Sequence, residues 1–160
     1  FTAEKLLYNY PVESHVYVMD RKSGEQKVFE ADSRFTKNVA EKCESGNYEQ
    51  WERHNIENPH FYDLMYLPQT GMYARLHLGG IEFDATRDIL NLMDDRDLYL
   101  TFFDKDFVVV GEAKLPSHRY NYFTGWRETN DGVALFVDNS LDENEKTEEL
   151  VLDIVRLQAD

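Results

Sequence analysis

The chain has 160 residues, enough for one domain with a sizeable core, and 42% of them are apolar, which excludes a globally disordered protein. Lysine and arginine total 17 against 31 aspartate and glutamate, so the formal net charge is −14. A surface this acidic repels phosphate groups and anionic lipid headgroups, and we therefore expect no nucleic acid partner. The single cysteine excludes an internal disulfide, and no apolar run approaches the roughly 20 residues of a transmembrane segment.

The N-terminal residues are typical of a small antiparallel sheet. Apolar and aromatic residues dominate 6–10 and 15–19, and a similar run returns at 26–29 after the turn at Ser23 and Gly24. A Ser-Gly turn between two such runs predicts a β-hairpin.

Residues 33–58 differ from the segments on either side, and we expect them to form a helical insertion. A helix is predicted over about 34–45 because four apolar residues recur there on one helical face: Phe35, Val39, Ala40 and Cys43. On that face Cys43 would be a buried, inert thiol. Residues 48–58 are mostly polar and fit either a second helical turn or a covering loop.

Strand patterns resume after the Asn-Pro pair at 58–59. We expect strands over 61–67, 72–78, 98–103 and 107–115, with a short helix near 86–93. Within 72–78 apolar residues alternate with Tyr73, Arg75 and His77, so one face of that strand is apolar and the other carries these three side chains.

The last group of strands is predicted over 122–126, 133–137 and 150–157, with a hairpin turn at the Asp131-Gly132 pair. Apolar strands that end at aspartate recur along the chain, which suggests repeated sheet units such as propeller blades. We therefore predict an all-β fold, a partial β-propeller of about three antiparallel blades at 1–32, 59–116 and 117–160.

Three segments carry a resemblance to a known family. They are residues 58–75, which include the runs FYDLMYL and YAR, residues 98–106, and residues 123–138. They resemble an uncharacterised family of bacterial envelope proteins that is catalogued as a domain of unknown function. Its members are similar to six-bladed β-propellers and are often lipoproteins. The resemblance implies that this chain is the C-terminal half of such a protein, in the periplasm or cell envelope, although no signal peptide is visible in it. It implies no functional residue.

Two groups of side chains are candidate ligand-binding residues. On strand 72–78, Arg75 and His77 would face the central channel of a propeller, or would pack against the next blade with Arg75 paired to a carboxylate. The second group combines rings and cations that can bind sugars or acidic groups by stacking and bidentate hydrogen bonds. Its members, which would otherwise form an inter-blade loop, are His118, Arg119, Tyr120, Tyr122, Trp126 and Arg127. Trp51, Arg53 and His54 would cover the same face.

Catalytic and metal-binding signatures are weak. The sequence contains no nucleophile elbow, P-loop, zinc-protease motif or dinucleotide fingerprint, so we predict no cofactor and lean towards a non-catalytic protein. Glu128 and Asp131 are a candidate carboxylate pair for glycoside chemistry. The acidic loop 138–149 partly matches a calcium-loop spacing, but Glu143 stands where that loop needs glycine, so we expect no tight calcium binding.

Three hypotheses about function follow. The first is a non-catalytic binding or scaffold module of the cell envelope that recognises a glycan, a peptide or a partner protein. The second is a glycan-active propeller enzyme that uses carboxylates near Trp126, and the third is a purely structural interaction domain. Because three blades leave open sheet faces, we also expect self-association or pairing with the missing half of a propeller.

Overall fold

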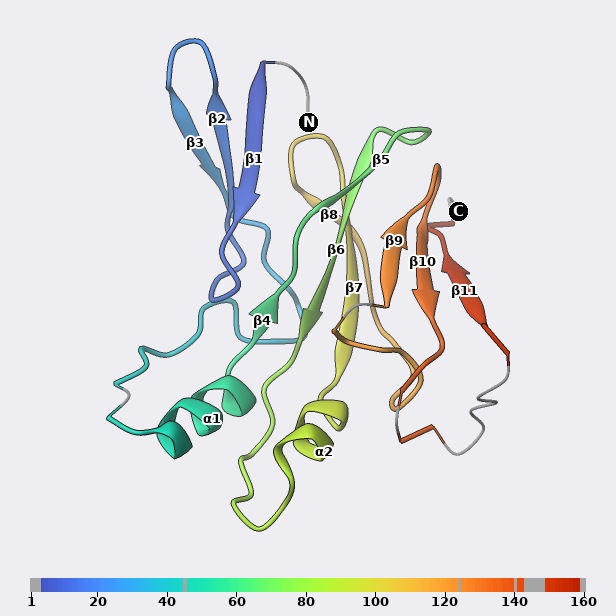
Figure 1. Ribbon diagram of the computed structural model, residues 1–160. Helices are drawn as coiled ribbons and strands as arrows, with labels where there is room; N and C mark the ends of the chain where they lie inside the picture. The colour runs from blue at the N-terminus through green and yellow to red at the C-terminus, as the bar shows by residue number, and fades with distance from the viewer. Residues whose placement is uncertain (1–3, 45, 124, 140, 143–148, 159–160) are drawn as a thin grey trace.

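The computed structural model of the chain describes residues 4–44, 46–123, 125–139, 141–142 and 149–158, and these form three antiparallel sheets and two helices (Figure 1). Strands outnumber helices, as the alternating sequence pattern predicted. The fold is all-β and consistent with a partial propeller.

The first sheet consists of β1 (Lys5–Asn9), β2 (Val16–Asp20) and β3 (Gln26–Phe29), hydrogen-bonded in that order. The hairpin predicted between the second and third strands is present. Its turn is held by the Asp20 carboxylate, which accepts hydrogen bonds from the backbone amides of Lys22 and Ser23 at 3.0 and 2.7 Å. Gly24 follows at φ +73°, a conformation that favours glycine.

The central sheet contains the longest strands. β4 (His60–Phe61) and β5 (Met65–Leu67) both pair with β6 (Met72–Leu78), which is followed by β7 (Leu98–Phe103) and β8 (Val109–Lys114). The register places His77 directly opposite Tyr99 and Arg75 opposite Thr101. Side chains that alternate along the sequence therefore form rows across this sheet.

The third sheet consists of β9 (Trp126–Glu128), β10 (Val133–Phe136) and β11 (Leu152–Val155). The predicted turn at Asp131-Gly132 joins β9 to β10. The strand expected over 122–126 begins only at Trp126.

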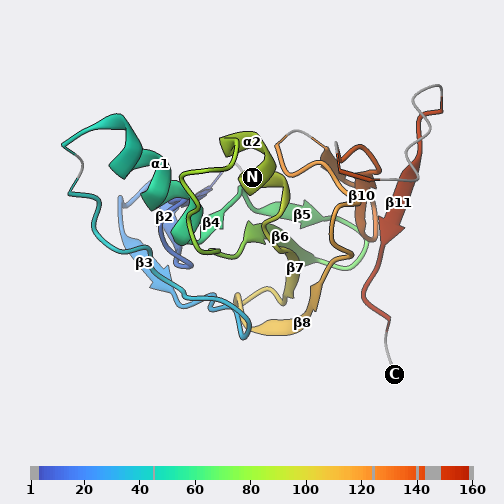
Figure 2. The same ribbon diagram turned by 90° about the horizontal axis from the view of Figure 1, so that it is seen from below.

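In each of the three sheets the chain enters at one edge strand and continues strand by strand to the opposite edge. Figure 2 shows β3, β8 and β11 along the outside of a fan of sheets, with β5 towards its middle. The inner strands are therefore β1, the β4–β5 segment and β9. This radial order is that of propeller blades.

The helix predicted over 34–45 is wrong, because the described residues of that range contain no helix. The Ser33 hydroxyl accepts hydrogen bonds from the amides of Phe35 and Thr36, and the Asn38 side chain bonds both backbone groups of Ser33. The Ser33 bonds resemble a helix cap, but no helix follows because the backbone of Asn38 and Ala40 bonds that of Ser14 and Val12 instead. Cys43 is consequently exposed, which corrects its expected burial.

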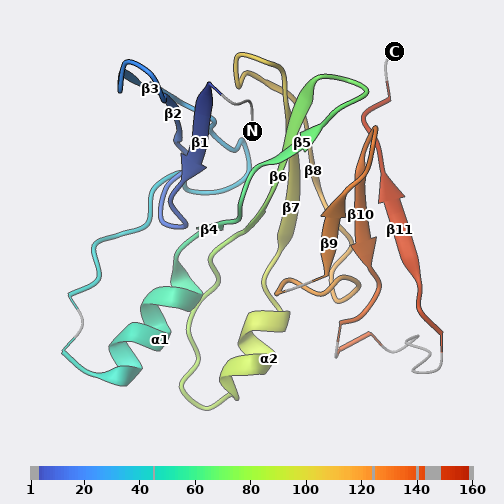
Figure 3. The ribbon, with the colours of Figure 1, turned by 45° about the horizontal axis from the view of Figure 1, so that its top comes forward.

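The helices lie at one end of the sheets (Figure 3). α1 (Tyr48–Glu57) begins after Asn47, whose side chain accepts from the Gln50 amide at 2.9 Å. α2 (Ile89–Asp94) begins after Asp88, which accepts from the Leu90 amide at 2.9 Å, close to the helix expected at 86–93. Asparagine and aspartate are favoured in this capping position.

Both faces of the central sheet are buried. One face packs against the third sheet, where Val133 and Leu135 are part of the larger core cluster. The other face packs against the first sheet through a smaller cluster of Val16, Ala31, Phe103 and Phe107. The three sheets are thus held in the order first, central, third by two separate apolar interfaces.

Candidate functional site

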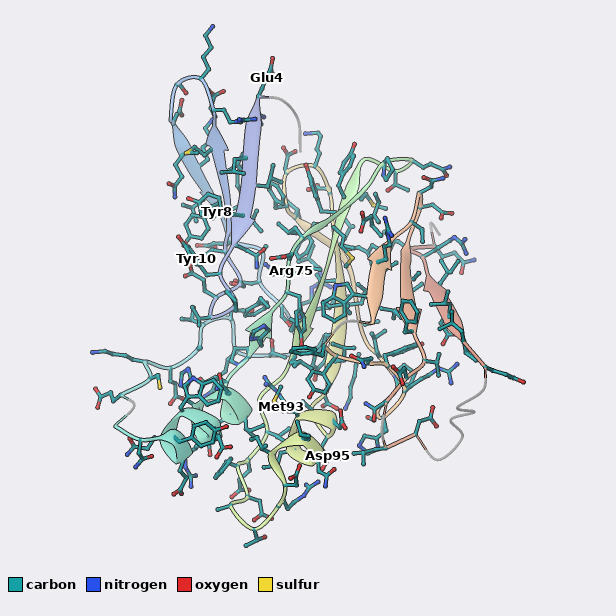
Figure 4. All side chains as sticks on the ribbon, in the orientation of Figure 1. Glu4, Tyr8, Tyr10, Arg75, Met93 and Asp95 are labelled. Carbon is teal, nitrogen blue, oxygen red and sulfur yellow. The ribbon has the colours of Figure 1, made fainter. Side chains whose placement is uncertain are left out.

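Arg75 lies in the interface between the first and central sheets rather than on an open surface (Figure 4). It is 1% exposed, and its two terminal nitrogens donate to the carbonyls of Ser14 and Ala31 at 2.8 and 2.7 Å. Its guanidinium also lies over the rings of Phe61 and Phe103, 4.8 and 5.3 Å from their centroids. Arg75 therefore packs between two sheets, and backbone carbonyls accept its hydrogen bonds in place of the expected carboxylate.

His77 is buried one step further along the same strand face. Its ring stacks between Phe61 and Tyr99 at centroid distances of 5.2 and 5.0 Å, and its Nε2 is 3.1 Å from the Ser33 hydroxyl. Burial, with a contribution from the charge of Arg75, lowers the pKa of His77 to about 3. The side chain is therefore neutral at physiological pH and is enclosed by the protein.

Four residues of the 118–127 group, His118, Arg119, Tyr120 and Tyr122, line one small hollow beside α2, whereas Trp126 and Arg127 lie outside its lining. The His118 ring is 2.8 Å from Asp95, at the end of α2, whereas Arg119 and Tyr120 both donate to Asp153 on β11 at 2.8 Å. Both hydrogen bonds stabilise the charged form of the Asp153 carboxylate and so lower the pKa of Asp153, the bond from Arg119 more than the bond from Tyr120. The two contacts join the loop after β8 to α2 and to the third sheet.

Trp126, Arg127 and Tyr122 have different surroundings. Trp126 packs towards the central sheet, with its ring centroid 4.5 Å from that of Tyr62. Arg127 is the next residue on β9 and lies on the opposite face, where it is exposed. Tyr122 is half-buried against the larger core cluster. Burial and the nearby Asp94 raise its pKa.

Residues 51–54 belong to α1, away from the inner strands. The Trp51 ring stacks on Tyr48 at 5.6 Å, and Arg53 pairs with Glu57 at 3.2 Å while lying over the Phe83 ring. The structure therefore does not bring them together with the 118–127 residues.

Glu128 and Asp131 do not converge on a shared pocket. The Asp131 carboxylate accepts from Arg156 Nε at 2.7 Å on the far side of the β9–β10 turn, whereas Glu128 lines a cleft at the inner edge of the third sheet. A pair of acids that acts on one glycosidic bond must flank it closely. This geometry does not support the two residues as a catalytic pair.

This cleft has a volume of about 550 Å³. It lies where the inner strands meet, and all three sheets contribute to it. β1 supplies residues 7–9, the chain between β4 and β6 supplies residues 63–66 and Pro68, and β9 supplies Glu128. Tyr73, at the start of β6, completes the lining.

Tyrosine rings and carboxylates determine the chemistry of the cleft. Tyr66 and Tyr73 lie opposite each other on paired strands with ring centroids 5.3 Å apart. Burial raises the pKa of Tyr73, and the neighbouring Tyr66 raises it further. The Tyr73 hydroxyl therefore stays protonated and can donate a hydrogen bond. Asp63 and Glu128 add two acids, and none of the lining residues is Lys, Arg or His. The cleft therefore suits uncharged or positively charged groups and repels anions.

Sequence reasoning singled out strand 72–78, of which Tyr73 lines the cleft, whereas Arg75 and His77 are buried between the sheets. It chose 72–78 because the polar alternation there is the clearest, yet that strand is second in its sheet and its polar face is covered by the first sheet. The available signal was a polar residue on or beside the first short strand of each sheet: Asn9 on β1, Asp63 after β4 and Glu128 on β9.

Among the described residues no three metal-ligating side chains come together, and none of their helices has the length and apolar character needed to cross a membrane.

The geometry defines an all-β, propeller-like protein with a cleft at its inner strands. Residues 1–114 of the 160 match the family described as "Domain of unknown function (DUF4221)", and the chain belongs to that family. It is similar to a solved structure of a member of this family from Bacteroides vulgatus, with 19% identity and a TM-score of 0.75. The match covers 96% of this chain and 43% of that protein, so the chain spans less than half of the solved relative. No curated protein matches.

Proposed function

We propose that this chain is a non-catalytic binding module of a bacterial envelope protein, and that its ligand binds in the cleft between the inner strands. The observation that carries the proposal is the position of the cleft. Strands from three sheets, more than 100 residues apart in sequence, place side chains around one hollow. Ligand sites are concave, and in propellers they lie at the central channel formed by the inner strands.

A glycan is the ligand class that the lining favours. Sugar rings stack on aromatic faces, and Tyr66 is 45% exposed at the mouth of the cleft. Sugar hydroxyls donate to carboxylates, which Asp63 and Glu128 provide. The two acids, with no cation in the lining, exclude ligands whose recognised group is phosphate, sulfate or carboxylate.

Isothermal titration of the chain against a panel of uncharged oligosaccharides tests this proposal. We expect binding to at least one member, with Tyr66→Ala weakening it about two- to tenfold, since one stacked ring contributes on the order of 0.5–1.5 kcal/mol. Glu128→Gln should weaken the same ligand. The matched control is Tyr48→Ala, which removes a tyrosine exposed on α1 and should bind as the wild type does.

Absence of binding across the panel, or binding that Tyr66→Ala leaves unchanged, would refute the proposed ligand class and site. Binding followed by cleavage of the oligosaccharide would favour the glycan-active enzyme instead. Product analysis by mass spectrometry separates the two.

The envelope location is part of the same proposal and rests on the family resemblance and the bacterial relative. Fractionation of cells that express the intact native protein should place it with periplasmic or membrane proteins. Recovery with cytoplasmic marker proteins would contradict that location.

A further inference from the structure

One residue behind the cleft, Tyr62, contacts the inner strands of all three sheets. It lies between β4 and β5, directly before the lining residue Asp63, and is not itself part of the lining. Its amide donates to the Leu76 carbonyl on β6 at 3.0 Å, which attaches it to the central sheet. Its ring packs against the larger core cluster, and burial raises the pKa of its hydroxyl. Figure 3 shows this segment between the first and third sheets.

The first link runs from Tyr62 to β1. Asn9, the last residue of β1, donates from Nδ2 to the Tyr62 carbonyl at 3.1 Å, across 53 residues of sequence. Beside this bond the Phe61 amide donates to the Pro11 carbonyl at 2.9 Å. Because Asn9 also lines the cleft, the β1 wall is fixed to the residue that precedes Asp63.

The second link runs from Tyr62 to β9. The Tyr62 and Trp126 rings lie 4.5 Å apart between centroids, at an interplanar angle of 56°. The register pairs Trp126 with Leu135 and Glu128 with Val133, and both partners are buried towards the central sheet, so Trp126 and Glu128 share that face of β9. Packing of Trp126 on Tyr62 therefore sets where the Glu128 carboxylate enters the cleft.

We propose that Tyr62 is a positioning residue of the cleft, which sets the spacing of its three walls without touching the ligand. Its carbonyl holds the β1 wall through Asn9, and its ring holds the β9 wall through Trp126. Arg75 and the core clusters attach the outer sheets to the central sheet by other contacts, so the loss of one link should displace a wall and leave the sheets folded. The expected effect on ligand affinity rests on the proposed function, whereas the effect on the walls does not.

Positioning matters here because the binding groups belong to separate sheets. Asp63 and Tyr66 come from the central sheet, Asn9 from the first and Glu128 from the third. Such groups must be held within about 0.5 Å of their productive positions by the residues behind them. Tyr62 is in contact with a residue on each neighbouring wall and is the supporting residue that these contacts identify.

Distances between pairs of spin labels test the two links separately. The labels are attached, two at a time and with Cys43→Ser removing the native thiol, at exposed positions in one hairpin turn of each sheet: Lys22→Cys, Lys105→Cys and Asn130→Cys. Asn9→Leu should broaden or shift the distance between the first and central sheets and leave that between the central and third unchanged. Tyr62→Leu, which keeps the carbonyl and removes the ring, should do the reverse. The matched control Tyr62→Phe keeps the ring and should match the wild type in both distances.

The pattern separates positioning from general stability. Loosening of both distances in each variant would indicate a general loss of stability and would overturn the proposal, as would wild-type distances in both variants. Circular dichroism checks that each variant is folded. If Tyr62→Leu does not fold, Trp126→Leu removes the same ring contact from the half-buried β9 side and should alter only the distance between the central and third sheets.

Titration with the uncharged oligosaccharides adds a second readout. Tyr62→Leu should weaken the binding of a member that the wild type binds by about two- to thirtyfold, the range typical of residues that act on a ligand through others. Tyr62→Phe should bind as the wild type does. Unchanged affinity in Tyr62→Leu would overturn the positioning role and leave the proposed function intact. If no member binds the wild type, the proposed function fails, and the label distances alone decide whether Tyr62 sets the walls.

Discussion

The guanidinium of Arg75 donates a 2.7 Å hydrogen bond to the backbone carbonyl of Ala31, 44 residues earlier in the chain. A second bond, to the carbonyl of Ser14, links the same side chain to the start of the second strand. Burial lowers the pKa of Arg75 to about 10, which leaves it charged at physiological pH. One side chain therefore fixes the first sheet to the central sheet and, with it, one wall of the cleft.

Replacing Arg75 with methionine should destabilise the protein by about 2–4 kcal/mol, because two buried carbonyls lose their donors while the apolar volume is nearly kept. Urea denaturation measures this change. Arg53→Met is the matched control, since its exposed pair with Glu57 should contribute about 0.5 kcal/mol or less. Equal unfolding midpoints for the two variants would show that Arg75 does not hold the sheets together.

His77 should make the protein less stable as the pH falls below neutrality. Its pKa is about 3 when folded and about 6.5 when unfolded, so the unfolded chain takes up the proton and the folded one does not. The stabilisation is complete above pH 6.5 and decreases by up to about 1.4 kcal/mol for each pH unit below it. The decrease continues until the folded pKa is reached.

The variant His77→Phe keeps the ring between Phe61 and Tyr99 but cannot be protonated. Its unfolding free energy should therefore depend less on pH than that of the wild type between about pH 5 and pH 7. His60, whose pKa is also lowered by burial, titrates in both proteins and cancels in the comparison. Identical pH slopes would mean that His77 is solvated in the folded protein.

Arg96 should control the attachment of α1. It is buried and donates to the carbonyls of Asn55 and Asn58 at the end of that helix, at 2.7 and 2.6 Å, and to Gly79 at 2.8 Å. Relative to the wild type, Arg96→Met should accelerate hydrogen exchange more in residues 48–57 than in β7. Uniformly faster exchange in both regions would indicate a general loss of stability and not a local attachment.

Calcium should leave the thermal unfolding midpoint unchanged. The acidic loop 138–149, most of which lies outside the described residues, has Glu143 where a calcium loop turns through glycine. Differential scanning fluorimetry with calcium and with a chelator measures the effect. A calcium-dependent rise that Asp138→Ala abolishes would contradict the expectation.

Local sequence patterns predicted most strands because alternation reports burial within one strand. The Asp-Gly and Ser-Gly turns likewise predicted their hairpins correctly. The helix at 34–45 was wrong because the backbone of that segment bonds residues 12–14 instead: the Asn38 carbonyl accepts from the Ser14 amide and the Ala40 amide donates to the Val12 carbonyl.

These local patterns could not predict how the three sheets pack on one another. The polar face of β6 suggested an open site, yet a second sheet covers it, and the pairing of Arg119 with Asp153 spans 34 residues. The cleft combines Asn9, Asp63 and Glu128, which no local spacing connects. Only the relative placement of three sheets brings them together.

The most direct test of the binding proposal is to map, by two-dimensional amide NMR, where an oligosaccharide from the uncharged panel contacts the chain. The account predicts that shifted resonances cluster at residues 7–9, 63–66, Tyr73 and Glu128, one group from the inner edge of each sheet. Shifts confined to α1 or to residues 118–122, or no shifts with any member of the panel, would contradict it.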